Sequence, residues 1–322
     1  MSAPDALDRL RDVFRRDRAW VASTLSDWFY TYHADLYLHG VPFEVYERKI
    51  AAVRRELGDA RRVLDLGAGF GVYACLLRLA GVEEVVALDY HAEKTRVASA
   101  LARHCGLSGL RVVHGDGLAL PFPPGTFDGA VAFASLSHVR DAPGALRALA
   151  SVLRAGGRLY VFEDNNSRWS GYARLMEPVW EHAESAPGGF VEIRRGLIRA
   201  RRPDLPGEEA DRLAKETRGL YGRSLEAAVD GFVAGGRLDN PRRLLVCDPR
   251  TGEFDEYPLH PAMVTGMLRD AGFEARLRSP YHGPWRGRLA PLKALAGGVY
   301  ALCPALLSWT SPIYAVVGTR RP

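Results

Sequence analysis

The stretch VLDLGAGFGVYA, Val63 to Ala74, decides the fold. An apolar run leads to the carboxylate Asp65, and three glycines follow at alternate positions, Gly67, Gly69 and Gly71. This order predicts a buried strand, a tight loop and then a helix, with a loop backbone that a ligand can approach closely. The residues raise the question of whether that ligand is a dinucleotide, a phosphate or something else.

The loop fits neither of the common phosphate-binding patterns. A dinucleotide loop G-x-G-x-x-G needs its third glycine at the position of Val72, and a P-loop needs Gly-Lys-Ser/Thr where the chain has Gly71-Val72-Tyr73. The carboxylate of Asp65 beside the loop would also repel a pyrophosphate. A ligand with an ammonium or sulfonium group suits the loop better.

Two further acids follow the next two predicted strands. Asp89, in VVALDY, comes 22 residues after Gly67 and can accept two hydrogen bonds from a ribose diol. Asp116, in HGDG, follows the third strand and can accept from an adenine amino group. Three acids after three successive strands predict an adenosine ligand without phosphates, for which S-adenosylmethionine is the obvious candidate.

From Arg62 onward, short apolar strands alternate with helices. This rhythm predicts an α/β fold, with a parallel sheet, helices on both faces and ligands at the edge where the strands end. It pauses after Asn165 and resumes with a helix over Pro261–Ala271 and strands over Glu274–Arg278 and Ile313–Gly318. The earlier predicted strands are Val63–Leu66, Val85–Leu88, Leu110–Val113, Gly129–Phe133 and Arg158–Phe162, and the helices between them are Val72–Ala80, Glu93–Cys105 and Pro143–Leu153.

The chain outside this core is predicted to be largely helical. Residues 1–57 show aromatic side chains at helical spacing, broken at Gly40–Pro42, and predict an N-terminal cap on the Rossmann-like core of residues 58–165. Residues 166–258 predict a mostly helical insertion or lid, with helices over Tyr172–Ala183, Glu208–Tyr221 and Ser224–Ala234 and a small hairpin turning at Asp248–Gly252. Residues 259–322 complete the sheet.

Four motifs in order resemble those of class I S-adenosylmethionine-dependent methyltransferases. They are VLDLGAGFG, VVALDY, HGDGLALPFPPGTFDGAVAFASLSHV and LRAGGRLYVFED. The acid–LPF–FD layout of the third is similar to that of the ubiquinone/menaquinone-biosynthesis branch. The resemblance covers about residues 55–165, and residues 261–278 and 313–318 fit the end of the fold. It implies a seven-stranded methyltransferase sheet with a reversed last strand, and S-adenosyl-L-methionine as cofactor.

The resemblance also implies which residues bind the cofactor, whereas Gly71 is expected to allow helix–sheet packing. The implied cofactor-binding residues are Asp65, Gly67, Ala68 and Gly69 at the methionine end and sulfonium, Asp89 at the ribose, Tyr90, Asp116 and Gly117 around the adenine, and Ser135 beside the transferable methyl.

The chemistry is expected to be an in-line displacement at the sulfonium methyl, which requires alignment of the partners and exclusion of water. A base is needed only if the nucleophile carries a proton that must leave, and His138, in SLSHVRD after the fourth strand, is the candidate. The alternative is a histidine that caps a helix or packs on the cofactor. Candidates to line the substrate pocket are Tyr30, Tyr32 and His33, with aromatic packing as their alternative, and Asp164, Asn165 and Asn166, with helix capping or loop turns as theirs.

Composition leaves three function classes open. The chain of 322 residues has a net charge of +5, and its basic residues are mostly arginines, which we interpret as composition bias. A cluster between Arg194 and Arg202 is expected to form a solvated helix face. We expect a methyltransferase that acts on a small molecule at oxygen, nitrogen or carbon. The alternatives are an RNA or protein methyltransferase that uses the arginine cluster, although ASLSHV lacks the NPPY-like pattern, and a non-catalytic S-adenosylmethionine-binding or regulatory protein.

The remaining features favour a cytoplasmic protein and leave its oligomeric state open. The four cysteines are far apart and predict reduced core residues, and no spacing indicates a metal site. No secretion signal or membrane span is expected. The most apolar stretch, Leu289 to Trp309, predicts a packed helix plus a loop, or alternatively a wall for an apolar substrate or a membrane surface. A homo-oligomer is compatible with the sequence, and no nucleic-acid partner is expected.

Overall fold

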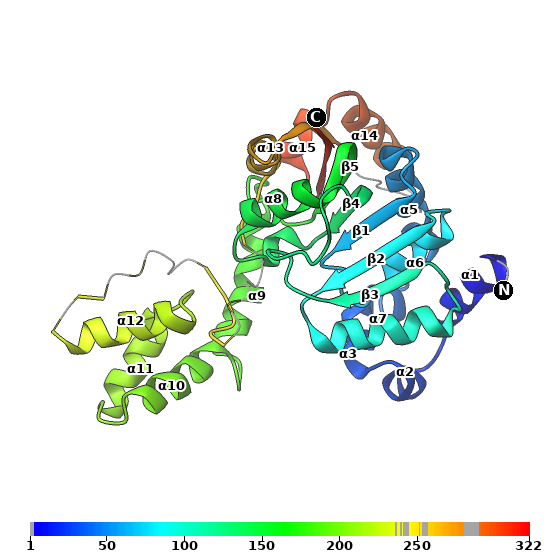
Figure 1. Ribbon diagram of the computed structural model, residues 1–322. Helices are drawn as coiled ribbons and strands as arrows, with labels where there is room; N and C mark the ends of the chain where they lie inside the picture. Colours follow the sequence, from blue (N-terminus) through cyan, green and yellow to red (C-terminus); the bar gives the residue numbers. More distant parts are fainter. Residues whose placement is uncertain are drawn as a thin grey trace. The chain divides into compact units, whose positions relative to one another are not determined.

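The computed structural model describes residues 3–235, 237–238, 240, 245–250, 252, 257–279 and 290–322. Seven strands form one sheet in the order β3-β2-β1-β4-β5-β7-β6 (Figure 1). Strands β1 to β5 pair in parallel, and β7 runs antiparallel to both β5 and β6, which confirms the predicted α/β sheet and its reversed last strand. The strands are β1 (Arg62–Leu66), β2 (Glu84–Asp89), β3 (Leu110–His114), β4 (Phe127–Phe133), β5 (Leu153–Glu163), β6 (Phe273–Arg278) and β7 (Tyr314–Arg320).

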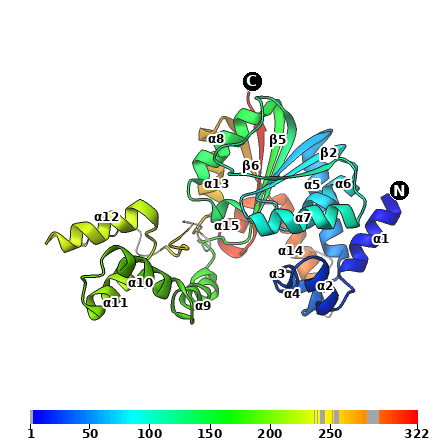
Figure 2. The same ribbon diagram turned by 60° about the horizontal axis from the view of Figure 1, so that its bottom comes forward.

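Helices cover both faces of the sheet. On one face, α6 (Val72–Leu79) and α7 (Ala92–His104) connect β1 to β2 and β2 to β3, and α5 (Glu44–Leu57) packs beside α6. On the other lie α8 (Ala142–Val152) and α13 (Pro261–Asp270), which contact each other (Figure 2). Because right-handed crossovers proceed outward from β1 in one direction and from β4 in the other, the ends of β1 and β4 border a crevice, the usual ligand position in such sheets.

The N-terminal segment is helical, in shorter pieces than the sequence spacing predicts. Asp17 and Ser26 each begin a new helix, because their side chains accept hydrogen bonds from the backbone N–H groups of Trp20 and Phe29. Apolar side chains from these helices, such as Phe29, join the core that covers β1 and β2. The helices are α1 (Ala3–Val13), α2 (Arg18–Thr24), α3 (Asp27–Tyr32) and α4 (Ala34–Tyr37).

The chain divides into two compact units. Met1–Leu136, Asp141–Asp164 and Pro261–Pro322 form the first, and Ser137–Arg140 with Asn165–His260 form the second. The second has its own small apolar core. Its helices are α9 (Tyr172–Ser185), α10 (Phe190–Arg201), α11 (Gly207–Glu216) and α12 (Gly222–Val233).

Two sequence predictions for the second unit need comment, and one helix was not predicted. Helix α11 ends at Glu216 instead of Tyr221, and Gly219, with a φ of 77°, turns the chain soon afterwards. Helix α10 was not delimited beforehand. The turn of the predicted hairpin is present, since the Gly252 N–H donates to the Asp248 carbonyl at 2.8 Å, but most of its predicted strand residues lie outside the described ones.

Between β6 and β7 the chain makes a helical excursion, comprising α14 (Ala290–Leu302), the 3₁₀ helix η2 (Pro304–Leu306) and α15 (Leu307–Thr310). The predicted helix is present, but the prediction that it is packed is wrong: Leu295 is 67% exposed and Leu302 90%. Cys303 is also exposed, against the expectation of core cysteines, while the other three are buried. Apolar composition predicts that a surface will be covered, but it does not specify what covers it. Within the described residues, the helices are too short or too polar to cross a bilayer.

Candidate cofactor site

The glycine loop between β1 and α6 is held by backbone geometry that favours glycine. Gly67, Gly69 and Gly71 have φ values of 68°, 55° and 80°. A Cβ on Gly67 would lie 2.5 Å from the Ser135 Cβ, and one on Gly71 would lie 2.8 Å from the Ala98 Cβ on α7. Close packing therefore requires glycine at position 67 as well as at position 71, whereas the sequence predicted a packing role only for Gly71. No described heavy atom lies within 4 Å of a Cβ on Gly69, so that side of the loop faces open space.

Asp65 is the least satisfied charged group of this loop. Its side chain stands on β1, Asp65 is 1% exposed, and neither carboxylate oxygen has a hydrogen-bond partner among the described residues. Burial, and secondarily the nearby charge of Asp89, raise the pKa of the Asp65 carboxyl to about 8. An ammonium group supplied by a ligand would provide both a hydrogen-bond donor and a counter-charge. Asp65 therefore fits a cationic amino-acid ligand such as the methionine end of S-adenosylmethionine.

Asp89 lies at the end of β2 and ties the loop to this strand. Its Oδ2 accepts a hydrogen bond from the Gly69 N–H at 2.8 Å, and its Oδ1 accepts one from the His91 N–H at 2.8 Å. Because each carboxylate oxygen can accept a second hydrogen bond, Asp89 can still receive a diol. Tyr90 follows it and is exposed. Ala68, within the loop, donates its N–H to the Leu88 carbonyl at 3.0 Å.

The remaining predicted cofactor residues lie after β3 and β4. The Asp116 Oδ1 accepts a hydrogen bond from the Leu118 N–H at 2.9 Å, and a Cβ on Gly117 would lie 2.9 Å from the Leu66 Cδ1. The Ser135 hydroxyl donates to the Leu66 carbonyl at 2.9 Å, which fixes the end of β4 beside the loop. Ala134, just before it, has a φ of 45°, a conformation that costs energy for a residue with a Cβ and is often found at functional sites.

The N-terminal helices cover the loop through Phe70, a residue that sequence analysis did not select. The ring centroid of Phe70 lies 5.3 Å from that of Trp28, 5.2 Å from Tyr32 and 6.1 Å from His33. His33 is buried and Tyr32 is exposed. Tyr30 instead stacks on Tyr37 at 4.4 Å. The position of Phe70 inside the glycine motif was the available signal, since a large aromatic residue there must find an apolar cover.

A second missed group is an aromatic wall with a lysine at the ends of β4 and β5. The Lys49 ammonium lies 3.5 Å from the ring centroid of Phe162 and 4.9 Å from that of Tyr73, and it donates to the Tyr73 hydroxyl at 3.1 Å. Tyr73 stacks on Phe133 at 4.4 Å. Phe133 ends β4, and Phe162 is the penultimate residue of β5. This wall therefore lies at the ligand edge of the sheet and combines aromatic surface with one positive charge.

The candidates after β4 and β5 are divided between the units. Asp164 is exposed in the first unit, while His138, half-buried in a 3₁₀ turn, belongs to the second. Asn165 and Asn166 are buried in the second unit: the Asn165 Nδ2 donates to the Tyr257 carbonyl at 2.8 Å, and the Asn166 Oδ1 accepts from the Arg168 N–H at 3.1 Å. These are turn and loop contacts, the alternative role considered for both asparagines.

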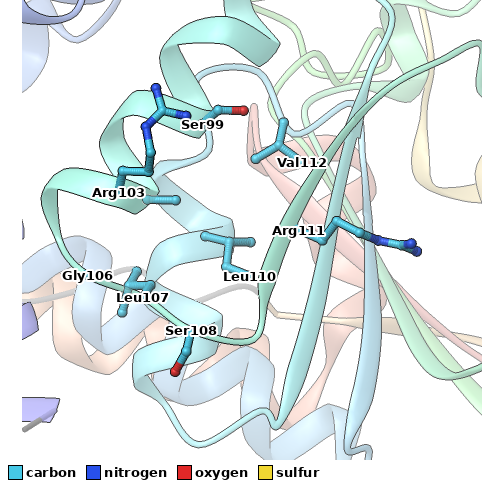
Figure 3. A pocket seen from close by; sticks show the side chains of 9 residues that line it. Ser99, Arg103, Gly106, Leu107, Ser108, Leu110, Arg111 and Val112 are labelled. Carbon is cyan, nitrogen blue, oxygen red and sulfur yellow. The ribbon is translucent and has the colours of Figure 1, made fainter. Parts of the chain in front are cut away.

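A separate hollow of about 560 Å³ lies between α7 and the first half of β3 (Figure 3). Leu110 and Val112 face it from the strand. None of its lining residues belongs to the glycine loop or follows a strand end, so it is distinct from the candidate cofactor site. The lining residues are Ser99, Ala102, Arg103, Gly106, Leu107, Ser108, Leu110, Arg111 and Val112.

The arginine cluster of the second unit is largely neutralised by acids. Arg194 is fully buried, against the expectation of a solvated face; its Nε donates to the Ala214 carbonyl at 2.7 Å, and its two Nη atoms bond the Glu184 carboxylate. Arg195 pairs with Asp211 at 2.5 Å. The other members pair with acids at 2.6 to 3.8 Å: Arg199 with Asp211, Arg201 with Asp230 and Glu226, and Arg202 with Asp204. Such pairing disfavours these arginines as phosphate contacts.

Comparisons with known proteins agree with this geometry. Residues 64–161 match the family described as a methyltransferase domain. The demethylmenaquinone methyltransferase of Thermus thermophilus is 38% identical over 140 residues, which are 43% of this chain and 63% of that enzyme. A ubiquinone/menaquinone biosynthesis C-methyltransferase of Pasteurella multocida is 39% identical over 105 residues, which are 32% of this chain and 39% of that enzyme. The chain thus spans less than two thirds of either relative.

The fold assignment itself rests on the strand order. The solved YcgJ protein of Bacillus subtilis is 16% identical, with a TM-score of 0.45, and the alignment covers 85% of this chain and 99% of that one. A TM-score of this size adds nothing to the assignment.

Fold and loop together define a nucleotide-type α/β domain whose ligand is cationic and carries no phosphate. Residues 64–161 form a methyltransferase domain of the class I S-adenosylmethionine-dependent type, and the chain is similar to enzymes of ubiquinone and menaquinone biosynthesis. The cofactor of this domain is S-adenosyl-L-methionine.

Proposed function

We propose that this chain transfers the methyl group of S-adenosyl-L-methionine to a ring carbon of a small aromatic acceptor of the quinol type. The main observation that supports methyl transfer as the function is the buried Asp65 carboxyl. It has no hydrogen-bond partner among the described residues and lies at the glycine loop of a methyltransferase domain. The acceptor class is supported by the names of the two relatives, a demethylmenaquinone methyltransferase and a ubiquinone/menaquinone biosynthesis C-methyltransferase.

The residues of the chain would bind and orient both partners. Asp65 would hold the cofactor ammonium, Asp89 the ribose hydroxyls, and Asp116 the adenine edge. Ser135, which is fixed to the Leu66 carbonyl, would border the reacting methyl. When bound, the cofactor supplies a methyl group activated by the positive sulfonium, so the protein's main task is alignment in a water-poor site.

The aromatic wall around Lys49 suits an acceptor ring that carries an oxygen anion. Ionisation of a quinol hydroxyl increases electron density at the neighbouring ring carbon, and a lysine ammonium stabilises the oxyanion so formed. Half-buried Tyr73 would contact the ring, while the buried Phe133 and Phe162 pack against Tyr73 and Lys49 and hold them in place. We assign His138 as the base that removes the hydroxyl proton, because histidine accepts protons near neutral pH. The ring carbon then takes the methyl as the sulfonium S–C bond breaks, and the hydrogen on that carbon moves as a proton to the ring oxygen, which restores the aromatic quinol.

The test is a methyl-transfer assay with a water-soluble short-chain demethylmenaquinol, with the product identified by mass spectrometry and the methyl position by NMR. We expect a new ring methyl, with S-adenosylhomocysteine formed in equal amount. His138→Ala should lower kcat by roughly 100-fold, the typical contribution of a general base, without weakening cofactor binding by calorimetry. Lys49→Met should raise KM, and Lys49→Arg should retain most of the activity.

Three outcomes would each contradict part of the proposal. Tight cofactor binding without methylation of any quinol or phenol would favour the non-catalytic alternative. Methylation at oxygen instead of carbon would keep the enzyme class but remove the ring-carbon assignment. Unchanged kcat in His138→Ala would exclude His138 as the base.

A further inference from the structure

The apolar excursion, defined here as residues 290–310, is not required to close the fold. It joins β6 to β7, which are neighbouring antiparallel strands paired from Arg278 with Ala315 to Phe273 with Arg320. Antiparallel neighbours need only a short turn between them. The chain instead places α14, η2 and α15 there. An excursion that the sheet does not need is a candidate for a separate role.

The excursion exposes far more apolar surface than a soluble helix normally does. Leu292 and Leu295 are 65% and 67% exposed, Leu302 is 90% exposed and Trp309 is 63% exposed. Within residues 290–310, Lys293 is the one residue with a formal charge. By contrast, Leu307 is fully buried, and α15 contacts α13, so the excursion is attached to the first unit. Contiguous exposed apolar surface of this kind usually marks an interaction site.

The position of the excursion relates it to the candidate site. Tyr314, at the start of β7, pairs with Glu163 at the end of β5. Because β7 runs antiparallel to β5, the excursion therefore joins the sheet at the edge where β1, β2 and β4 also end. That edge carries Asp65, Asp89 and Ser135. The exposed apolar residues thus project from the same edge at which cofactor and acceptor would bind.

The charge of the surrounding sequence indicates what covers this surface. The connection between β6 and β7, residues 279–313, contains three arginines or lysines and no aspartate or glutamate. Apolar side chains with a tryptophan, combined with nearby positive charge, are the combination that binds the surface of an anionic bilayer. Helix α14, from Ala290 to Leu302, is too short to span a bilayer and would lie in its interface.

We propose that residues 290–310 are a lipid-contact surface, which holds the substrate edge of the sheet against an anionic membrane. Leu292, Leu295 and Leu302 insert among the acyl chains, and Trp309 lies at headgroup level. The surface would give the site direct access to an acceptor dissolved in lipid. This last step rests on the proposed function, whereas the lipid contact itself does not.

The first experiment is flotation of the purified full chain with phosphatidylcholine–phosphatidylglycerol vesicles. The test variant is Leu295→Ser/Leu302→Ser, and the matched control is Leu38→Ser/Leu175→Ser, which changes two exposed leucines elsewhere. If Leu295 and Leu302 insert into the lipid, loss of their side chains should weaken vesicle binding by at least about tenfold. The control should bind like the unaltered chain. Failure of the unaltered chain to float, or equal flotation of the test variant, would overturn the proposal.

A second measurement locates the contact independently. Cys303 is exposed, next to Leu302, and the other cysteines are buried, so an environment-sensitive fluorophore can be attached at Cys303 alone. Vesicles should shift its emission to shorter wavelength. Flotation without such a shift would place the contact elsewhere on the chain. If the Leu295→Ser/Leu302→Ser change instead converts a dimer to a monomer in solution and vesicles do not bind, the surface is a self-association interface and the proposal fails.

The failure of this proposal can be told apart from failure of the proposed function. In the test variant, calorimetric cofactor affinity and methyl transfer to the soluble short-chain quinol should be unchanged, while transfer to a long-chain quinol in vesicles should fall by about tenfold, in parallel with binding. If no quinol is methylated by any form but flotation behaves as expected, the acceptor assignment fails and the lipid-contact surface stands.

Discussion

Two buried charged groups, one in each unit, differ in how they are satisfied. Asp65 in the first unit is 1% exposed and has no hydrogen-bond partner among the described residues. Arg194 in the second is 0% exposed, and its guanidinium bonds both the Glu184 carboxylate and the Ala214 carbonyl. Both are strongly polar side chains removed from water, yet only one is paired by the protein.

The difference separates a structural charge from a ligand-binding one. A buried charge without a partner destabilises the fold, so a folded chain keeps one where a ligand or another function compensates. A buried charge with a bidentate partner and a further hydrogen bond is part of the internal packing. Asp65 is therefore the proposed ligand-binding charge, whereas Arg194 and Glu184 belong to the internal packing of the helical unit.

The largest effect is expected from leaving Arg194 unpaired. Glu184→Ala should lower the free energy of unfolding by about 3–5 kcal/mol, the usual cost of an uncompensated buried charge. Chemical denaturation followed by circular dichroism would measure it. The double change Arg194→Met/Glu184→Leu is the control and should cost much less, because no buried charge remains. Equal losses in the two variants would show that packing, and not charge pairing, dominates here.

Removal of Asp89 should abolish measurable cofactor binding. Asp89→Ala leaves the N–H groups of Gly69 and His91 without their acceptor and removes the candidate ribose contact. Two ribose hydroxyls would lose a charged acceptor, and each such hydrogen bond contributes about 1.5–3 kcal/mol, so the loss of affinity should exceed roughly 100-fold. Calorimetric titration with S-adenosylmethionine measures it, and Asp116→Ala, whose carboxylate holds one local turn, should have a smaller effect. Micromolar binding retained by Asp89→Ala would contradict the site assignment.

Asp65→Asn should weaken cofactor binding but stabilise the ligand-free protein. The amide removes the charge that would hold the ammonium, a charge-assisted bond worth about 1.5–3 kcal/mol, or roughly 10- to 100-fold in affinity. It also removes a buried carboxylate that has no partner, so the melting temperature without ligand should rise above pH 7. A fall in both quantities would mean that the Asp65 carboxylate already has a structural partner.

The same carboxyl predicts a pH dependence of definite sign. Burial raises the pKa of Asp65 to about 8, whereas an unfolded aspartate titrates near pH 3.9. Between about pH 4 and pH 8 the folded state holds the Asp65 proton and the unfolded state does not. The contribution of this proton to the stability of the ligand-free protein is therefore greatest at acid pH and falls as the pH rises from about 4 to 8. A bound ammonium favours the ionised form. Cofactor affinity should therefore rise toward pH 8, with proton release detectable in buffers of different ionisation enthalpy, and Asp65→Asn should lose both effects.

The smallest effects are expected from alanine substitutions at two glycines of the loop, Gly67 and Gly69. Both have positive φ, so alanine at either position costs about 1 kcal/mol of backbone strain. Gly67→Ala also forces a Cβ to 2.5 Å from the Ser135 Cβ, whereas Gly69→Ala meets nothing described within 4 Å. Gly67→Ala should therefore lower the melting temperature more, and Gly69→Ala should affect cofactor affinity more than stability. The reverse order would exchange the packing and ligand-facing roles of the two residues.

Local patterns predicted much of the first unit. The alternation of apolar runs and helices predicted β1 to β4 and α6 to α8 to within two residues at every end, because a buried parallel strand is apolar and the apolar residues of a helix recur every three to four positions. The placement of Asp65, Asp89 and Asp116 at strand ends followed from the same periodicity. Phe70, Lys49 and their aromatic neighbours were not found, because their contacts join segments that are distant in the chain and have no periodic signature.

By itself, the sequence determined the sheet, the cofactor class and the acids that we propose bind the cofactor, because these depend on spacing within one continuous segment. Only the tertiary structure decided that Arg194 is buried against Glu184, that Asp65 has no described protein partner, and that the apolar residues of α14 face outward. The reason is physical: apolar or charged character fixes what a side chain needs, but whether the need is met depends on which other segments fold against it.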